Sequence, residues 1–156
     1  MEVTCEGDYP DKIEKEFFEQ CVLYMGRKLI ASNHLSSLKV NLKFTPGFIK
    51  EKQAFAVCFP IIPTWFTFTT PKSYRIEIEA ALSKKQFGIS LAHECVHIQQ
   101  MVYGVLKMPP HYHKITWAGF ELDMKKPEQE QPYEIEALGR QDFLYKTFLE
   151  HYEQNI

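Results

Sequence analysis

The pattern of apolar and polar positions is most informative from Ser83 to Lys107, where it predicts a long and almost fully buried helix. Ser83 is a good N-cap, no proline interrupts the stretch, and Gly104 stands where a helix usually stops. At about 100° of rotation per residue, apolar side chains cover most of the helix circumference. One narrow polar stripe remains, which consists of Gln86, Ser90, His93, Glu94, His97 and Gln100. Buried imidazoles and carboxylates are costly unless they are paired or bound to a metal, so this stripe requires a partner.

The rest of the chain predicts further helices and strands around this helix. Asp11 to Ser32 has apolar residues at helical spacing, and a last helix starts at Pro132 and runs toward the C-terminus. Alternating apolar and polar residues predict strands at Leu38 to Phe44, Gln53 to Phe59 and Tyr74 to Ala80. Trp65 to Thr70 fits either a fourth strand or an exposed aromatic loop. We therefore expect an α+β fold with a small, mostly antiparallel or mixed sheet of three or four strands and helices on one face.

Length and composition narrow the class of protein. The 156 residues are 45% hydrophobic, so we expect a single domain over residues 1–156 with a substantial core. A net charge of −2 gives no reason to expect nucleic acid or an anionic membrane as a partner. No apolar run is long enough to span a bilayer and the acidic N-terminus is unlike a signal peptide, so we expect a cytoplasmic location. The four cysteines form no CxxC pair, which is typical of buried, reduced thiols.

Residues 93–97 read His-Glu-Cys-Val-His, an HExxH pattern. Side chains four residues apart lie on one face of a helix, so His93 and His97 can both reach a single ion at roughly 2.0 to 2.1 Å. Glu94 points about a quarter turn away, where it can take a proton from a metal-bound water without binding the metal itself. The alternative is a chance match whose histidines make ordinary hydrogen bonds in the core. The polar stripe favours the metal site.

The last helix supplies a candidate for the third ligand. Its predicted apolar face consists of Ala137, Leu138, Leu144, Tyr145, Phe148, Leu149 and Tyr152. Glu134 falls near the middle of this face, whereas Glu136 falls nearly opposite, where a solvated carboxylate belongs. A carboxylate on a core face is rarely left unpaired, so Glu134 is the predicted third metal ligand and Glu136 a predicted surface residue. The alternative is that Glu134 is only a first-turn charge favoured by the helix dipole.

With these residues in place, the sequence resembles a very small zincin metallopeptidase of the gluzincin type, in which HExxH lies on one helix and a glutamate on a following helix completes the zinc site. More closely, the segments HECVHIQQ and PYEIEA, with Trp117 and Gly119 between them, resemble short uncharacterised phage and bacterial metallopeptidases that carry HExVHxxQ and PWExEA. The resemblance covers roughly Tyr74 to Arg140. It implies a zincin-like fold, one zinc ion, a protein or peptide substrate, and a virus-encoded enzyme that acts in the host cell.

The resemblance also implies a mechanism, in which a zinc-activated water attacks the peptide carbonyl and Glu94 moves the proton to the leaving amine. Two positions depart from the thermolysin-like pattern. Leu138 stands where an aspartate would orient a zinc histidine, so Gln100 or Gln141 is a candidate for that support. Tyr133 replaces the tryptophan before the ligand glutamate. Candidates for the group that polarises the scissile carbonyl follow the motif helix and are His111, Tyr112 and His113.

Substrate binding and two rival hypotheses stay open at this point. An extended substrate is expected to add as a strand beside the motif helix, on either Gln53 to Phe59 or Tyr74 to Ala80. The loop from Pro109 to Gln131 is a candidate cover for the site. A SprT-like peptidase would instead use His111 or His113 as its third ligand and associate with DNA, against which the lack of a basic patch counts. The other hypothesis is a catalytically silent protein of the zincin fold that acts in interactions or within a virion.

Overall fold

The structure is a computed structural model, which describes residues 1–8, 15–61, 70–109 and 114–154. These residues form an α+β arrangement whose elements are, in order, β1 (Glu2–Gly7), α1 (Lys15–Leu29), α2 (Ser32–Leu35), β2 (Lys39–Thr45), α3 (Phe48–Lys52), β3 (Ala56–Pro60), β4 (Ser73–Glu79), α4 (Lys84–Val102), β5 (Leu106–Lys107), β6 (Thr116–Trp117), β7 (Phe120–Glu121), the short 3₁₀ helix η1 (Glu128–Glu130) and α5 (Pro132–Gln154). The predicted helices and the three predicted strands are present, with shifts of a few residues at their ends. The aromatic stretch at 65–69 and the histidines at 111 and 113 lie outside the described residues.

The main sheet has four strands in the order β1, β2, β4, β3. β1 pairs with β2 and β2 pairs with β4 in parallel, and β3 at the edge pairs with β4 in the antiparallel direction. The expectation of a mixed sheet is confirmed, whereas a mostly antiparallel sheet is wrong. The difference comes from β1, which was not predicted because none of its residues is fully buried and the sequence therefore shows no strong alternation. Its link to β2 passes through α1, and such a crossover gives parallel pairing.

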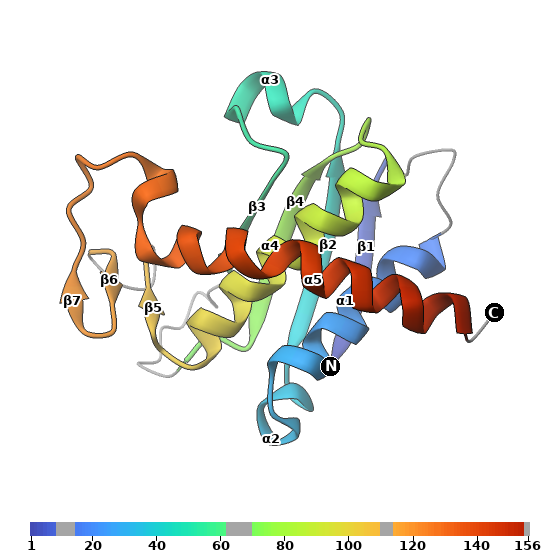
Figure 1. Cartoon of the computed structure of the whole chain (residues 1–156), viewed down its shortest axis with the longest axis horizontal. Coiled ribbons are helices and arrows are strands. Elements are labelled where there is room, and N and C mark those ends of the chain that lie inside the picture. The colour runs from blue at the N-terminus through green and yellow to red at the C-terminus, as the bar shows by residue number, and fades with distance from the viewer. Residues whose placement is uncertain (9–14, 62–69, 110–113, 155–156) are drawn as a thin grey trace.

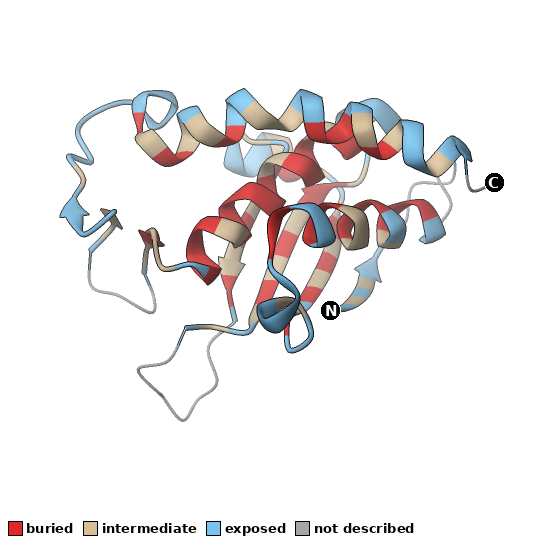
Figure 2. Ribbon diagram, turned by 60° about the horizontal axis from the view of Figure 1, so that its bottom comes forward, coloured by how far each residue is buried: buried red, intermediate tan, exposed pale blue. Residues whose placement is uncertain are grey.

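Helices cover one face of this sheet, and the motif helix lies at the centre of the molecule (Figure 1, Figure 2). Side chains alternate along β2 and β4, which places Leu42, Phe44, Ile76 and Ile78 on the covered face, where all are buried. α1 and α4 pack against each other, and α4 also contacts β3 and β4. α5 crosses over α4 and α1 on the side away from the sheet (Figure 1). Because α4 has neighbours on nearly every side, its apolar residues can cover most of its circumference.

The segment after α4, predicted as a long polar loop, contains more structure than expected. β5, β6 and β7 form a second, antiparallel sheet of three very short strands. Ala118 and Gly119 connect β6 to β7 with φ values of 49° and 87°, as a tight hairpin turn requires. Strands of two residues are too short to show alternation, so the sequence could not reveal them. In the part of the chain that the structure describes, no helix is long and apolar enough to cross a membrane.

Gly88 allows α5 to approach α4 closely. A Cβ at this position would collide with the ring of Tyr145 on α5, and both residues are buried. We therefore expect Gly88→Ala to lower the free energy of unfolding by about 1 to 3 kcal/mol, the usual cost of overfilling a packed core. Chemical denaturation followed by circular dichroism measures this change.

Gly139 on α5 provides the matched control, since a Cβ there meets no atom within 4 Å. Gly139→Ala should raise the free energy of unfolding by up to about 1 kcal/mol, because alanine favours helix more than glycine does. Equal shifts in the same direction for the two variants would contradict the close packing of α4 on α5.

Candidate metal centre

α4 presents the HExxH residues to the interior. Its first turn is fixed by a capping box, in which the Ser83 hydroxyl accepts from the Gln86 N–H and the Gln86 side chain accepts from the Ser83 N–H. The helix ends at Val102, and Gly104 follows with a left-handed φ of 69°. The buried polar residues of α4 are Ser90, Glu94, His97 and Gln100. Most of the predicted polar stripe therefore lies inside the molecule.

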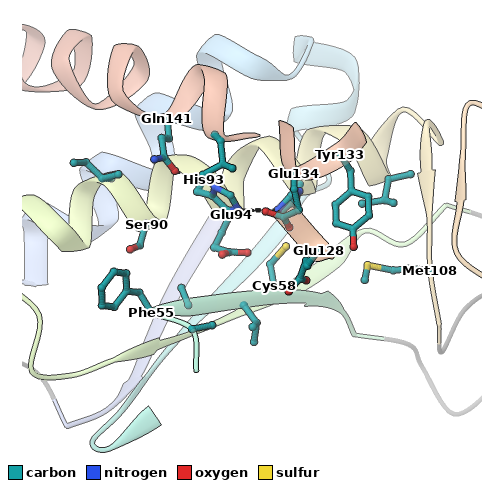
Figure 3. Close-up of a pocket in the computed structure, with 17 residues that line it drawn as sticks. Phe55, Cys58, Ser90, His93, Glu94, Met108, Glu128, Tyr133, Glu134 and Gln141 are labelled. Carbon is teal, nitrogen blue, oxygen red and sulfur yellow. Dashed lines mark hydrogen bonds and ion pairs between the residues drawn. The ribbon is translucent and has the colours of Figure 1, made fainter. Parts of the chain in front are cut away.

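Three side chains from two helices converge on one point, and two of them, His93 and Glu134, are labelled in Figure 3. The Nε2 atoms of His93 and His97 lie 3.0 Å apart. Glu134, in the first turn of α5, places one carboxylate oxygen 3.1 Å from the Nε2 of His93 and the other 3.1 Å from that of His97. Among the residues that the structure describes, these three form a group that could hold a metal ion.

The hydrogen bonds behind the histidines fix which ring nitrogens face this point. Gln100 places its Nε2 3.1 Å from the Tyr133 carbonyl oxygen and 3.1 Å from a Glu136 carboxylate oxygen. Both partners are acceptors, so the amide nitrogen must face them and Oε1 must face His97. Oε1 lies 2.9 Å from the His97 Nδ1, which therefore carries the hydrogen. The Nε2 of His97 is left with a lone pair that points at the other two ligand atoms.

The Nδ1 of His93 lies 3.0 Å from Oε1 of Gln141 on α5. If Nδ1 carries the hydrogen here as well, two imidazole lone pairs and a carboxylate meet at about the separation of a hydrogen bond, and none of the three is a donor while the imidazoles are neutral. A cation stabilises such a group, either as an extra proton on an imidazole or as a metal ion. In a tetrahedral zinc site with bonds of about 2.0 to 2.1 Å, ligand atoms lie roughly 3.3 Å apart. The observed separations are within a few tenths of an ångström of this value.

The charges around the site agree with that conclusion. Burial opposes the charged form of Glu134, but the hydrogen bonds that His93 and His97 donate when they are protonated, together with their positive charge, outweigh burial and lower the pKa of the Glu134 carboxyl to about 2. Burial likewise opposes the charged form of His97, but Glu134 and the nearby negative charge of Glu94 raise the pKa of the imidazole above its ordinary value. The centre therefore favours positive charge between the two helices.

Glu94 lies beside this group without belonging to it. Burial raises the pKa of the Glu94 carboxyl, and the nearby His97 and His93 offset that effect only in part. The thiol of Cys58 on β3 forms a hydrogen bond with the same carboxylate. Glu94 is thus held between α4 and the edge strand of the sheet.

A cleft of about 460 Å³ opens over the centre. Its floor carries His93, Glu94 and Glu134, and one wall is formed by residues 54–58, which lead into β3 and make up its first half. In Figure 3, Ser90 and Phe55 lie on one side of Glu94, and Tyr133 and Met108 lie on the other. The three potential ligands and the adjacent carboxylate are therefore accessible to a molecule bound along β3.

One sequence prediction about α5 is corrected and another is incomplete. Leu138 is predicted in the core, but 44% of its surface is exposed at the cleft. Glu136, predicted as a surface residue, keeps 38% of its side chain exposed, but its carboxylate also accepts a hydrogen bond from Gln100 on α4. The pattern of a single helix shows the angle of each residue but not which neighbour lies there.

Further sequence predictions concern the side chains that support the two histidines and those that complete the site. Gln100 and Gln141 were named as alternative supports for the histidines, and each contacts one of them. Cys58 and the cleft-facing side chain of Tyr133 were missed as site residues, since contacts between β3 and α4 leave no local signal in the sequence. The predicted candidates for carbonyl polarisation, at 111–113, lie outside the described residues.

The interpretation of these side chains as a metal site rests on the geometry described above. Comparison of the chain with protein-family models, with curated proteins and with solved structures gives no significant match.

Proposed function

We propose that this chain is a zinc-dependent peptidase of the zincin type, in which His93, His97 and Glu134 hold one zinc ion and Glu94 is the general base. The observation that carries the proposal is the convergence of three side chains beside a buried carboxylate in an open cleft, with two imidazole nitrogens 3.0 Å apart and each 3.1 Å from one oxygen of Glu134. The position of α4 against a mixed sheet, next to the antiparallel edge strand β3, supports the zincin arrangement. The test is whether the zinc-loaded chain cleaves peptide bonds and stops when Glu94 is replaced.

The roles of the residues follow from their positions. Zinc held in such a site polarises the substrate carbonyl and lowers the pKa of a water molecule. The Glu94 carboxylate takes one proton from the attacking water as the new bond from oxygen to carbon forms. It then delivers this proton to the amide nitrogen as the bond from carbon to nitrogen breaks, so that the immediate products are a carboxylic acid and an amine. The carboxylic acid, which keeps the second proton of the water, passes it to the amine, and a carboxylate and an ammonium group leave. The Cys58 thiol orients Glu94 for both transfers.

β3 is the strand that suits a peptide substrate. β4 is paired on both sides, whereas β3, within the described part of the chain, has β4 as its single neighbour. The Glu79 N–H donates to the Phe55 carbonyl, and the Ile61 N–H donates to the Ser73 carbonyl. In an antiparallel pair, hydrogen-bonded residues alternate, so odd-numbered residues of β3 face β4. Even-numbered residues therefore point their main-chain groups toward the cleft.

Few residues of β3 can form hydrogen bonds with a substrate strand. Ala56 and Cys58 offer both an N–H and a carbonyl, but Pro60 has no N–H and ends the donor series. A substrate strand added here would form paired hydrogen bonds at two β3 positions only. We infer that the substrate is recognised as a short extended segment next to the scissile bond.

This register predicts the effect of Ala56→Pro, which removes one outward N–H without removing a hydrogen bond to β4. The rate constant kcat/KM should fall about fivefold, because one net hydrogen bond is worth about 1 ± 0.5 kcal/mol. Initial rates on a quenched fluorescent peptide library, measured with zinc content and far-ultraviolet circular dichroism, provide the test.

Ala56→Val is the matched control, since valine adds a similar bulk but keeps the N–H. It should lose much less activity than Ala56→Pro. Equal losses in the two variants would point to a steric effect in the cleft and would contradict the proposed substrate register.

A further inference from the structure

A chain of hydrogen bonds extends behind His97, away from the cleft. The His97 Nδ1 donates to Gln100 over 2.9 Å, and the Gln100 Nε2 donates to a Glu136 oxygen over 3.1 Å. The other oxygen of Glu136 accepts from the Arg140 Nη1 over 2.8 Å. An imidazole that faces the metal centre is thus connected to a carboxylate through a single amide group.

The middle of this chain is buried and has only one possible orientation. Gln100 is 3% exposed, and its Nε2 has two acceptors, the Tyr133 carbonyl and Glu136. Rotating the amide by 180° would point its oxygen at both acceptors, at the cost of two buried hydrogen bonds. The amide oxygen is therefore held against His97.

The two histidines are supported unequally. Gln141 faces His93 with a neutral amide, and among the described residues no charged group donates to or accepts from Gln141. Behind His97, the negative charge of Glu136 draws the Gln100 amide hydrogen and so makes the amide oxygen a stronger acceptor. A stronger acceptor at Nδ1 fixes the tautomer and increases the basicity of the Nε2 lone pair.

We propose that Glu136, acting through Gln100, is a positioning residue for the metal ligand His97. This inference rests on the proposed metal centre. Residues 134 and 136 are about 200° apart on a helix, so they cannot both face one ion. Gln100 reaches around the first turn of α5 and connects the second glutamate to the site from behind. One glutamate of the Glu-Ile-Glu segment binds the ion and the other holds a ligand in place.

The experiment measures zinc affinity by competition with a chromophoric chelator. Glu136→Gln should weaken zinc binding about tenfold, the lower end of the range for lost partners of ligand histidines. The exchanged pair Gln100→Glu with Glu136→Gln should recover part of the lost affinity, because the carboxylate then accepts directly from His97 while its second oxygen faces the Tyr133 carbonyl. A purely structural role for Glu136 would not be rescued by this exchange.

A second measurement determines the tautomer of His97. Long-range proton–nitrogen NMR spectra of the zinc-free proteins, recorded at a pH where the imidazole is neutral, should show His97 protonated at Nδ1 alone in wild type and in the exchanged pair, and a mixture of tautomers in Gln100→Leu. Glu150→Gln is the control, since Glu150 is an exposed carboxylate on α5 whose ion pair with Lys146 spans 4.0 Å. It should bind zinc as wild type does.

The outcomes separate this proposal from the proposed function. Wild-type zinc affinity in Glu136→Gln, with an unchanged His97 tautomer in Gln100→Leu, would overturn the positioning role and leave the metal centre intact. A folded wild type with no affinity for zinc would overturn both.

Discussion

Replacing Glu94 by glutamine is expected to lower the rate of peptide hydrolysis by about 10² to 10⁴, the contribution of a positioned general base. Glutamine has nearly the same shape and can still accept the hydrogen bond from Cys58, but it cannot take a proton from water. Because Glu94 lies beside the three ligand atoms and is not one of them, the variant should bind zinc as wild type does. Initial rates of the zinc-loaded proteins on a quenched fluorescent peptide library measure the effect, with zinc determined in the same samples.

The control for this variant is Glu150→Gln, which removes an exposed carboxylate far along α5 and should leave both the rate and the zinc content unchanged. Wild-type activity in Glu94→Gln would exclude Glu94 as the base. A wild type that binds zinc but hydrolyses no peptide would favour the hypothesis of a catalytically silent protein.

The spacing of apolar residues predicted the elements that are long or whose buried and exposed positions alternate clearly. α4 is buried nearly all round, and β2 and β4 alternate strictly, so apolar spacing alone was enough to place them. β1 has no fully buried residue, and its pairing with β2 joins segments more than thirty positions apart. Whether the sheet contains parallel strand pairs could be judged only from that pairing. For this reason a mixed sheet could be predicted, but its parallel half could not.

The same distinction applies to the site. His93 and His97 are one turn apart on one helix, and Glu134 is a charge among apolar positions, so local spacing selected the three side chains that the structure brings together. The contact of Glu136 with Gln100 could not be predicted, because Gln100 belongs to another helix and lies 36 residues earlier in the sequence. Leu138 fits the apolar side of α5, but that side borders the cleft at this point. Such assignments need the relative placement of α4 and α5.

Zinc is expected to bind at one ion per chain and to raise the unfolding temperature. At a free zinc concentration 100 times Kd, binding stabilises the folded state by about 2.7 kcal/mol. For a chain of this size that corresponds to a rise of roughly 5 to 10 °C. The physical reason is that the ligands come from α4 and α5, so the ion connects two helices and separates three acceptors that otherwise face one another. Elemental analysis after gel filtration and thermal unfolding with and without zinc measure these effects.

Two variants decide which side chain is the third ligand. Glu134→Ala should lose both the bound zinc and the thermal gain, whereas the double variant His111→Ala/His113→Ala should keep both. Loss of zinc in the double variant instead would support the SprT-like hypothesis, and a folded, metal-free wild type would refute the metal centre. The geometry favours Glu134 because its two oxygens each lie 3.1 Å from one of the two histidine nitrogens. A carboxylate in that position also offsets the positive charge of a zinc ion, which a third neutral imidazole would not do.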